Sequence, residues 1–259
     1  MDLDKLLFLR GLGINRISFG IQSFSDTLLR KLRRLHTARE AREAVRLAQQ
    51  AGFDNINVDL MSGLPQQTLA EWTATLSDAV GLGVQHISAY GLKVEEGTPF
   101  FLEQQQGRLA LPTDEEDEAM YDLTEDFLAS AGFYRYEISN YAVPGRQCLH
   151  NLKYWHYQPY VGMGASAHSF ENGKRTANTA DVTQYIATIK KNDTPAVAEE
   201  YINQADAIAE FVFLALRTTH GVLFSEFASR FGMDFRHYFA KPVAELVKDG
   251  MLLVEQDKA

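Results

Sequence analysis

Short apolar runs alternate with amphipathic stretches through the first part of the chain. Three runs have the length and residue types of buried strands, namely 15–23 (NRISFGIQS), 56–61 (INVDLM) and 86–92 (HISAYGL). Apolar residues recur at helical spacing in the stretches 3–8, 37–50 and 69–82. Because strand and helix alternate at the length of a βα unit, we predict an α/β fold with a parallel sheet or barrel. Functional residues are then expected at the carboxyl ends of the strands.

The pattern changes after the third run. We predict a helix over 115–131, an aromatic strand over 133–139 and a long irregular stretch over 140–170, which is rich in aromatic residues and histidines. A short strand over 174–179 and a helix over 182–191 follow. This middle part extends the predicted barrel.

The last part of the chain has the pattern of a separate helical unit. Helical spacing is found around 208–215, 224–231 and 235–249, and an apolar segment, 251–254, is predicted to be a strand. Short helices with a strand are similar to a winged helix. From His220 to the end, however, Lys+Arg is 5 and Asp+Glu is 6, whereas a face that binds nucleic acid is basic. We predict three parts, 1–110, 111–200 and 201–259, and no nucleic acid partner.

The composition of the 259 residues is that of an ordinary globular protein, with 46% hydrophobic and 23% charged residues and a net charge of −9. No apolar run reaches the about 18 residues of a membrane span, and the start lacks the pattern of a signal peptide. The one cysteine, Cys148, fits a reducing compartment and by itself builds neither a disulfide nor an iron–sulfur site. We expect a cytoplasmic protein without an integral membrane segment.

Two residues stand out by their chemistry. Asp59 lies within the apolar run 56–61, although buried parallel strands are usually apolar throughout. It is either a functional carboxylate or an aspartate at a strand edge that is hydrogen-bonded to a neighbouring turn. His150 lies in HNLKYW, where it is either an axial ligand beside aromatic walls or a loop histidine that caps backbone carbonyls.

Other candidates carry less chemistry. The histidines that stand alone in their segments are expected to be surface or core residues, and they are His36, His86, His220 and His237. The segment 162–168 (GMGASAH) completes neither the dinucleotide-binding nor the Walker pattern. Its small residues are expected to permit a close backbone approach.

Several segments in order carry a resemblance to a known family. They are 15–24 (NRISFGIQSF), 56–65 (INVDLMSGLP), 136–140 (YEISN), 150–155 (HNLKYW) and 162–169 (GMGASAHS). Together they resemble the oxygen-independent coproporphyrinogen III oxidase-like family of radical S-adenosylmethionine proteins, in particular its heme chaperone branch. The resemblance covers essentially the whole chain. It implies a partial (β/α) barrel of the radical S-adenosylmethionine type, followed by a small helical, winged-helix-like domain.

The resemblance also implies cofactors and the residues that hold them. The family uses S-adenosylmethionine, a [4Fe–4S] cluster and, in the chaperone branch, heme. The positions that match its S-adenosylmethionine site are Gln22, Arg34, Asp59 and Gly91, and heme is expected at His150. The residue types suit these roles, because a carboxylate and an amide can hold ribose hydroxyls and a guanidinium can hold a carboxylate bidentately.

The chain also departs from the family pattern. The cluster of the family is held by three cysteines in a CxxxCxxC motif, which this sequence lacks, so no metal ligand is predicted for it here. Residue 1 falls just before what corresponds to the fourth strand of the family, so we expect an N-terminally truncated chain. The predicted function is that of a heme chaperone-like protein that binds heme and passes it to acceptor proteins. The alternatives are the porphyrin-synthesising oxidase and an inactive truncated chain, and oxidase activity is not favoured.

Overall fold

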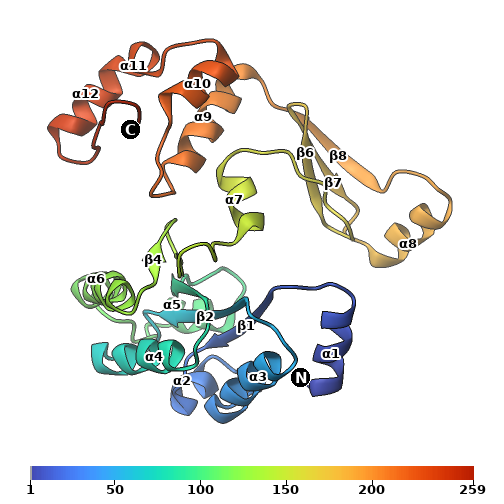
Figure 1. Ribbon diagram of the computed structural model, residues 1–259, viewed down its shortest axis with the longest axis vertical. Helices are drawn as coiled ribbons and strands as arrows, with labels where there is room; N and C mark the ends of the chain where they lie inside the picture. Colours follow the sequence, from blue (N-terminus) through green and yellow to red (C-terminus); the bar gives the residue numbers. More distant parts are fainter. Residues whose placement is uncertain (1) are drawn as a thin grey trace. The chain divides into compact units, whose positions relative to one another are not determined.

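The structure is a computed structural model that describes residues 2–259. It divides into two compact units, one that runs to Gln147 and one from Cys148 to Ala259 (Figure 1). Each unit has its own cluster of buried apolar side chains. The described residues contain no helix that is long and apolar enough to cross a membrane.

The first unit begins with alternating helices and strands. Its elements are α1 (Leu3–Gly11), β1 (Ile17–Gln22), α2 (Asp26–Lys31), α3 (Ala38–Gln50), β2 (Ile56–Ser62), α4 (Leu69–Gly81), β3 (His86–Gly91), α5 (Pro99–Gln105), α6 (Asp114–Ser130), β4 (Tyr134–Arg135) and β5 (Asn140–Ala142). The main helices start at threonines that form capping boxes with a glutamate three residues later, at Thr37, Thr68 and Thr113. These caps satisfy backbone N–H groups that the first helical turn leaves unpaired.

The strands of the first unit form one five-stranded sheet in the order β1-β2-β3-β5-β4. The pairs β1–β2 and β2–β3 are parallel, while β5 is antiparallel to β3 and to β4. Gly20 on β1 is paired with Asp59 on β2, and Asp59 is paired with Ser88 on β3. The parallel βα order predicted from the sequence is therefore confirmed.

The two faces of this sheet differ in polarity. One face is apolar and belongs to the core, with α3 against β1 and with α4 and α6 against β2 (Figure 1). The strand residues in that core include Ile21, Ile56, Val58, Leu60 and Ile87. The alternate residues are polar and are linked to one another by hydrogen bonds, and they include Ser18, Asn57, Asp59, His86 and Ser88. One face of the sheet is thus an apolar core face. The other face carries the polar side chains of the candidate site.

One prediction in the first unit is wrong. The segment 133–139 was expected to be a single strand, but β4 covers only Tyr134–Arg135. The backbone N–H of Tyr136 donates to the carbonyl of Asn140 at 3.1 Å, so the chain turns back here and β5 pairs with β4. The aromatic residues that suggested a strand lie instead in a tight hairpin.

The second unit joins a small sheet to a helical end. Its elements are α7 (Leu149–Trp155), β6 (His168–Glu171), β7 (Lys174–Asn178), α8 (Val182–Lys190), β8 (Ala196–Tyr201), α9 (Gln204–Ala215), α10 (Phe224–Phe231), α11 (Phe235–Tyr238) and α12 (Ala240–Lys248). The strands form a three-stranded antiparallel sheet, β6-β7-β8. The core of this unit is built around buried aromatic rings, among them Phe211, Phe227 and Phe235.

Three predictions for the second half of the chain need correction. The stretch 140–170 is not irregular throughout, because it contains β5, α7 and the start of β6. The helix over 235–249 is broken into α11 and α12, since Pro242 has no N–H to donate to the carbonyl of Tyr238, where α11 ends. The segment 251–254 is not a strand. The pairing found near it is a single bridge between Leu223 and Lys258.

Candidate functional site

Gly20 on β1 lies at the centre of a cluster of the predicted site residues. The Nη2 atom of Arg34 donates to the carbonyl oxygen of Gly20 at 2.8 Å. A Cβ atom added to Gly20 would lie 3.1 Å from Nε2 of Gln22 and 3.2 Å from Nη2 of Arg34. Asp59 is the β2 residue paired with Gly20. The structure therefore brings Gln22, Arg34 and Asp59 together around one position that has no side chain.

The backbone at the end of β1 explains how the side chain of Gln22 is directed. The register with β2 shifts between Gly20 and Gln22, and Gln22 has a φ of 70°, in the left-handed region. Such irregularities re-aim a side chain at the end of a strand at a cost in backbone strain. The neighbouring carbonyl, that of Ile21, lies 3.1 Å from Nε2 of His36. Side chains from the segment after α2 thus cap consecutive carbonyls of β1.

Asp59 has both carboxylate oxygens fixed by neighbouring donors. Nδ2 of Asn57 donates to Oδ1 at 2.7 Å, and the hydroxyl of Ser18 donates to Oδ2 at 3.1 Å. Asp59 itself is half-buried. A carboxylate oxygen accepts more than one hydrogen bond, so each oxygen keeps capacity for a further donor. The arrangement matches neither a turn-bonded aspartate nor an unpaired buried charge.

The hydrogen bonds of Asn57 continue deeper into the unit. Oδ1 of Asn57 lies 2.6 Å from Nδ1 of His86 and accepts from the hydroxyl of Ser88 at 3.2 Å. On the other side of the imidazole ring, Nε2 of His86 lies 2.7 Å from the hydroxyl of Tyr136. His86 is fully buried, and this burial, with Arg16 nearby, lowers its pKa to about 3. His86 is therefore neutral at physiological pH.

Gly91 stands apart from the other predicted site residues. It ends β3 and is paired with Ser62 on β2, three positions beyond the Asp59–Ser88 pair. A Cβ at Gly91 would meet no atom within 4 Å. Gly91 lines a small cavity of about 60 Å³ with Asp117 and Thr124, which come from α6. The place of Gly91 in the S-adenosylmethionine site stays a prediction.

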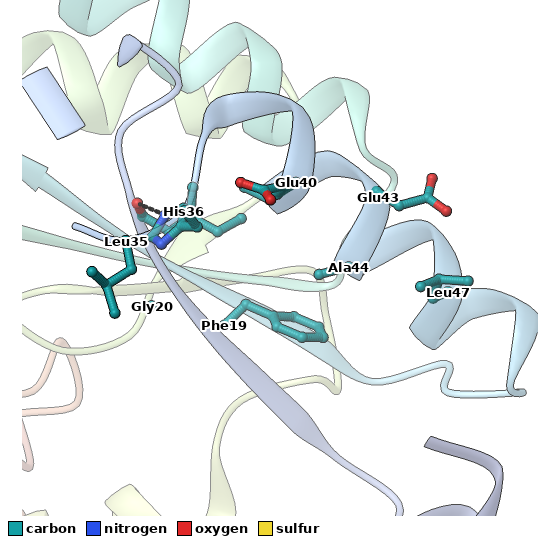
Figure 2. A pocket seen from close by; sticks show the side chains of 10 residues that line it. Phe19, Gly20, Leu35, His36, Glu40, Glu43, Ala44 and Leu47 are labelled. Carbon is teal, nitrogen blue, oxygen red and sulfur yellow. Dashed lines mark hydrogen bonds between the residues drawn. The ribbon is translucent and has the colours of Figure 1, made fainter. Parts of the chain in front are cut away.

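A larger cavity lies beside β1. It has a volume of about 460 Å³ and is enclosed mainly by β1 and α3 (Figure 2). Its lining includes Phe19, Gly20, Leu35, His36 and Leu47, and it includes none of Gln22, Arg34 and Asp59. The cavity therefore reaches Gly20, but the polar side chains of the predicted site do not line it.

His150 lies on α7 in the second unit and is exposed. Its Nε2 atom lies 3.0 Å from the hydroxyl of Tyr154, and the two rings meet edge to face with their centroids 5.0 Å apart. The four-residue spacing places both side chains on one face of the helix. Tyr160 packs against Tyr154, with the ring centroids 4.7 Å apart. His150 is thus a helical histidine beside aromatic rings, and the hydrogen bond of its ring goes to a side chain.

The residues present do not fit an iron–sulfur cluster. Cys148 is the one cysteine of the 259 residues, and it is 6% exposed at the start of α7. Within residues 2–259 no group of histidines, cysteines and carboxylates is placed to hold a metal ion. A [4Fe–4S] cluster is held by several thiolates, so this chain does not supply its ligands.

The sequence pointed to Asp59 but not to the residues that hold it. Ser18, Asn57, His86 and Tyr136 were not among the predicted site residues. A signal was present, because polar residues at 57 and 59 and at 86 and 88 follow the two-residue period of a strand. When two adjacent parallel strands each have one polar face, those two faces lie on the same side of the sheet.

Comparison with known proteins defines the class of this fold. Residues 1–79 match the radical SAM superfamily model, and residues 202–258 match the HemN C-terminal domain model. The solved structure of coproporphyrinogen III oxidase (HemN) from Escherichia coli superposes with a TM-score of 0.81 over 99% of this chain and 62% of that chain. At 23% sequence identity, this likeness shows the fold. The partial radical S-adenosylmethionine barrel expected from the sequence is confirmed.

Named relatives define the family within that class. Heme chaperone HemW from Bacillus subtilis is 37% identical over 97% of this chain and 66% of its own length. HemW from Escherichia coli is 39% identical over 69% of this chain and 48% of its own length. HemW from Buchnera aphidicola subsp. Acyrthosiphon pisum is 31% identical over 99% of this chain and 67% of its own length. The chain belongs to the HemW family, and it spans about half to two thirds of the length of these relatives.

Proposed function

We propose that this chain acts as the heme-carrying part of a heme chaperone, binding heme at His150 and passing it to acceptor proteins. S-adenosylmethionine binds on the polar face of the sheet in the first unit. We also propose that the protein is cytoplasmic and that the chain has the three domains predicted from its sequence, 1–110, 111–200 and 201–259. The names of the relatives support the chaperone function, since each is called a heme chaperone.

The exposure of His150 is the observation that carries the heme half of the proposal. An axial ligand needs an accessible imidazole nitrogen. His150 is exposed, and iron that binds at its Nε2 atom displaces the hydroxyl of Tyr154, which lies 3.0 Å from that nitrogen. Cys148, which is the alternative iron ligand nearby, is 6% exposed. Tyr154 and Tyr160 add aromatic surface next to the histidine. Bound heme supplies the iron centre that is handed on, and the chain supplies the ligand and the apolar wall.

The cluster around Gly20 supports the S-adenosylmethionine half. Asp59 and Gln22 supply a carboxylate and an amide, which suit ribose hydroxyls, and Arg34 supplies a guanidinium, which suits the methionine carboxylate. A side chain at Gly20 would fill the space beside Gln22 and Arg34. The residues present therefore fit the nucleoside and amino-acid parts of this cofactor.

The oxidase alternative has weaker support. The likeness to coproporphyrinogen III oxidase shows the fold alone, at 23% identity. The HemW relatives, in contrast, are 31% to 43% identical to this chain. No specific feature of the described residues favours decarboxylation of a porphyrin side chain, so chaperone function is the better proposal.

Titration of hemin into the 259-residue chain tests the heme site. We expect His150→Ala to change the absorption spectrum of the heme complex and to lower its affinity, because the axial nitrogen is lost. Cys148→Ser should be nearly silent, since that side chain is buried. Trp155→Phe should leave the ligand-field bands unchanged, because an indole ring is not an iron ligand.

His237→Ala is the matched control, since it removes another exposed histidine from the same unit. His156→Ala and His168→Ala test two further histidines of this unit, one at the end of α7 and one at the start of β6. An unchanged spectrum and affinity in His150→Ala, with a loss in Cys148→Ser or in either of these variants, would show that a different residue binds the iron.

A further inference from the structure

We propose that Tyr136, His86 and Asn57 form a positioning relay that holds the carboxylate of Asp59 in the orientation needed to accept two vicinal hydroxyls, those of a ribose. This inference rests on the proposed S-adenosylmethionine site and deepens it. Tyr136 touches no ligand in this proposal, and neither does His86. They are positioning residues that act through Asn57.

The direction of the relay follows from the chemistry of its members. His86 is neutral, so one ring nitrogen donates and the other accepts. If the hydroxyl of Tyr136 donates to Nε2, at 2.7 Å, then Nδ1 carries the proton and donates to Oδ1 of Asn57, at 2.6 Å. Ser88 adds a second donor to the same amide oxygen at 3.2 Å. The amide oxygen of Asn57 is thereby held toward the interior of the unit.

This orientation of Asn57 determines what Asp59 meets. With Oδ1 turned toward His86 and Ser88, the Nδ2 group of Asn57 points to Oδ1 of Asp59 at 2.7 Å and to the hydroxyl of Ser18 at 2.7 Å. A flipped amide would place its oxygen against the carboxylate, and two acceptors repel each other. The relay therefore selects the amide orientation that supports Asp59.

The carboxylate plane of Asp59 is fixed as a result. Asn57 occupies one acceptor position on Oδ1, and Ser18 occupies one on Oδ2. Each oxygen keeps capacity for a further hydrogen bond. Two acceptors on one carboxylate match the two hydroxyls of a ribose diol, and holding the carboxylate in place before binding removes an ordering cost.

The three members of the relay are buried. His86 is 0% exposed, Asn57 is 3% exposed and Tyr136 is 8% exposed, so water does not readily replace a missing member. Tyr136 comes from the turn between β4 and β5, while the other members lie on β2 and β3. The relay thus couples a hairpin at one side of the sheet to the carboxylate on its second strand.

A mutant cycle measured with S-adenosylmethionine by calorimetry tests the relay in the 259-residue chain. Tyr136→Phe keeps the ring and removes the hydroxyl, and we expect about fivefold weaker binding, the equivalent of about one buried hydrogen bond. In an Asp59→Asn background the same change should have no further effect, because the relay acts through that carboxylate. Tyr134→Phe is the matched control, since Tyr134 is 57% exposed on the same segment, and it should leave binding unchanged.

Nitrogen NMR of His86 without ligand gives the second readout, which a merely structural role would not move. We expect the Nδ1–H tautomer in the wild type and a mixture of tautomers in Tyr136→Phe. The nitrogen shifts should also respond to Asp59→Asn, through Asn57. An Nε2–H tautomer in the wild type would reverse the direction of donation and overturn the relay.

The outcomes separate the relay from the proposed function. If the wild type binds S-adenosylmethionine and Asp59→Asn weakens it, but Tyr136→Phe does not, the relay is wrong and the site stands. If the wild type does not bind, or if Asp59→Asn has no effect, the proposed site is wrong. In that case the nitrogen chemical shifts of His86 still test the relay. If they are the same in Asp59→Asn as in the wild type, the relay is wrong as well. If they differ, His86 and Asn57 still orient the carboxylate of Asp59.

Discussion

Gly20 shows how a residue without a side chain can shape a site. Its backbone conformation is not one that requires glycine, since its φ is not in the left-handed region. The space where a Cβ would lie is bordered by Nε2 of Gln22 and Nη2 of Arg34, at 3.1 Å and 3.2 Å. Gly20 is therefore needed for room, and the room serves two side chains proposed to bind a ligand.

We expect Gly20→Ala to weaken the binding of S-adenosylmethionine while leaving the fold intact. Both contacted atoms are the far ends of flexible side chains, so they can move at a cost to stability of less than about 1 kcal/mol. Their displacement takes an amide and a guanidinium out of place, and each lost polar contact costs about 1–3 kcal/mol in affinity. Calorimetry for binding and urea unfolding for stability measure the two effects separately.

Gly81→Ala serves as the control for this change, because a Cβ there meets nothing within 4 Å and Gly81 lies at the end of a helix. Unaltered binding in Gly20→Ala would mean that Gln22 and Arg34 do not contact the ligand. A large loss of stability would mean that the neighbouring side chains are rigid.

Single residues could be predicted from the sequence where they break a pattern. Asp59 interrupts an apolar strand, and the structure places it at the centre of a hydrogen-bonded group. His86 breaks no pattern visible from its own segment, and it was expected to be a surface or core histidine. It is a core histidine, and its partner Tyr136 lies 50 positions away in the sequence. Without the register of the strands, nothing local connects the two.

At the scale of elements, the period of apolar residues predicted the long helices and the parallel strands well. α3 and α4 begin directly after their capping threonines, Thr37 and Thr68, where start signals are strong. The short helices α2 and α5 have too few residues to display a period, and they were not predicted. β8 was not predicted either, because it is exposed along most of its length and contains no run of buried apolar residues. The hairpin at β4 and β5 was missed because its turn residues interrupt an aromatic run.

Gly162 in the second unit supports the expectation that small residues in this segment permit a close backbone approach. A Cβ there would collide with backbone atoms of His168, the first residue of β6. The neighbouring residues Tyr160 and Phe170 form a backbone bridge, with both N–H···O distances at 2.9 Å. The segment before β6 thus lies against that strand with no room for a side chain.

We expect Gly162→Ala to destabilise the second unit by about 1–3 kcal/mol, because the contact is with backbone, which cannot rotate away. Urea unfolding measures the loss, and faster hydrogen exchange at the amide of Phe170 locates it at the bridge. Gly11→Ala is the control, since a Cβ there meets nothing within 4 Å. A stability equal to that of the wild type, with Phe170 still protected, would show that the two segments can separate at little cost.

At the scale of the whole molecule, stability depends on pH through the groups that folding buries. Among these groups, His86 has the pKa that burial changes within the range around neutral pH. His86 titrates in a higher range when the chain is unfolded, near its ordinary pKa of 6.5, whereas burial lowers its folded pKa to about 3. Between these two values the unfolded chain binds a proton that the folded chain does not.

Acidification from about pH 7.5 to about pH 5 should therefore lower the free energy of unfolding, because stability falls wherever the unfolded state binds more protons. For one histidine with these two pKa values the loss is about 2 kcal/mol over that interval.

His86→Gln removes the titrating group. The free energy of unfolding of this variant should therefore fall by about 2 kcal/mol less than that of the wild type over the same interval, even though the variant is less stable overall. His237→Gln, which changes an exposed histidine, should keep the wild-type slope. The test compares how the free energy of unfolding changes with pH, measured by urea unfolding at several pH values, and does not compare its absolute values. Equal slopes in His86→Gln and the wild type would mean that His86 accepts a proton in the folded protein, and the neutral donor–acceptor role assigned to it would then fail.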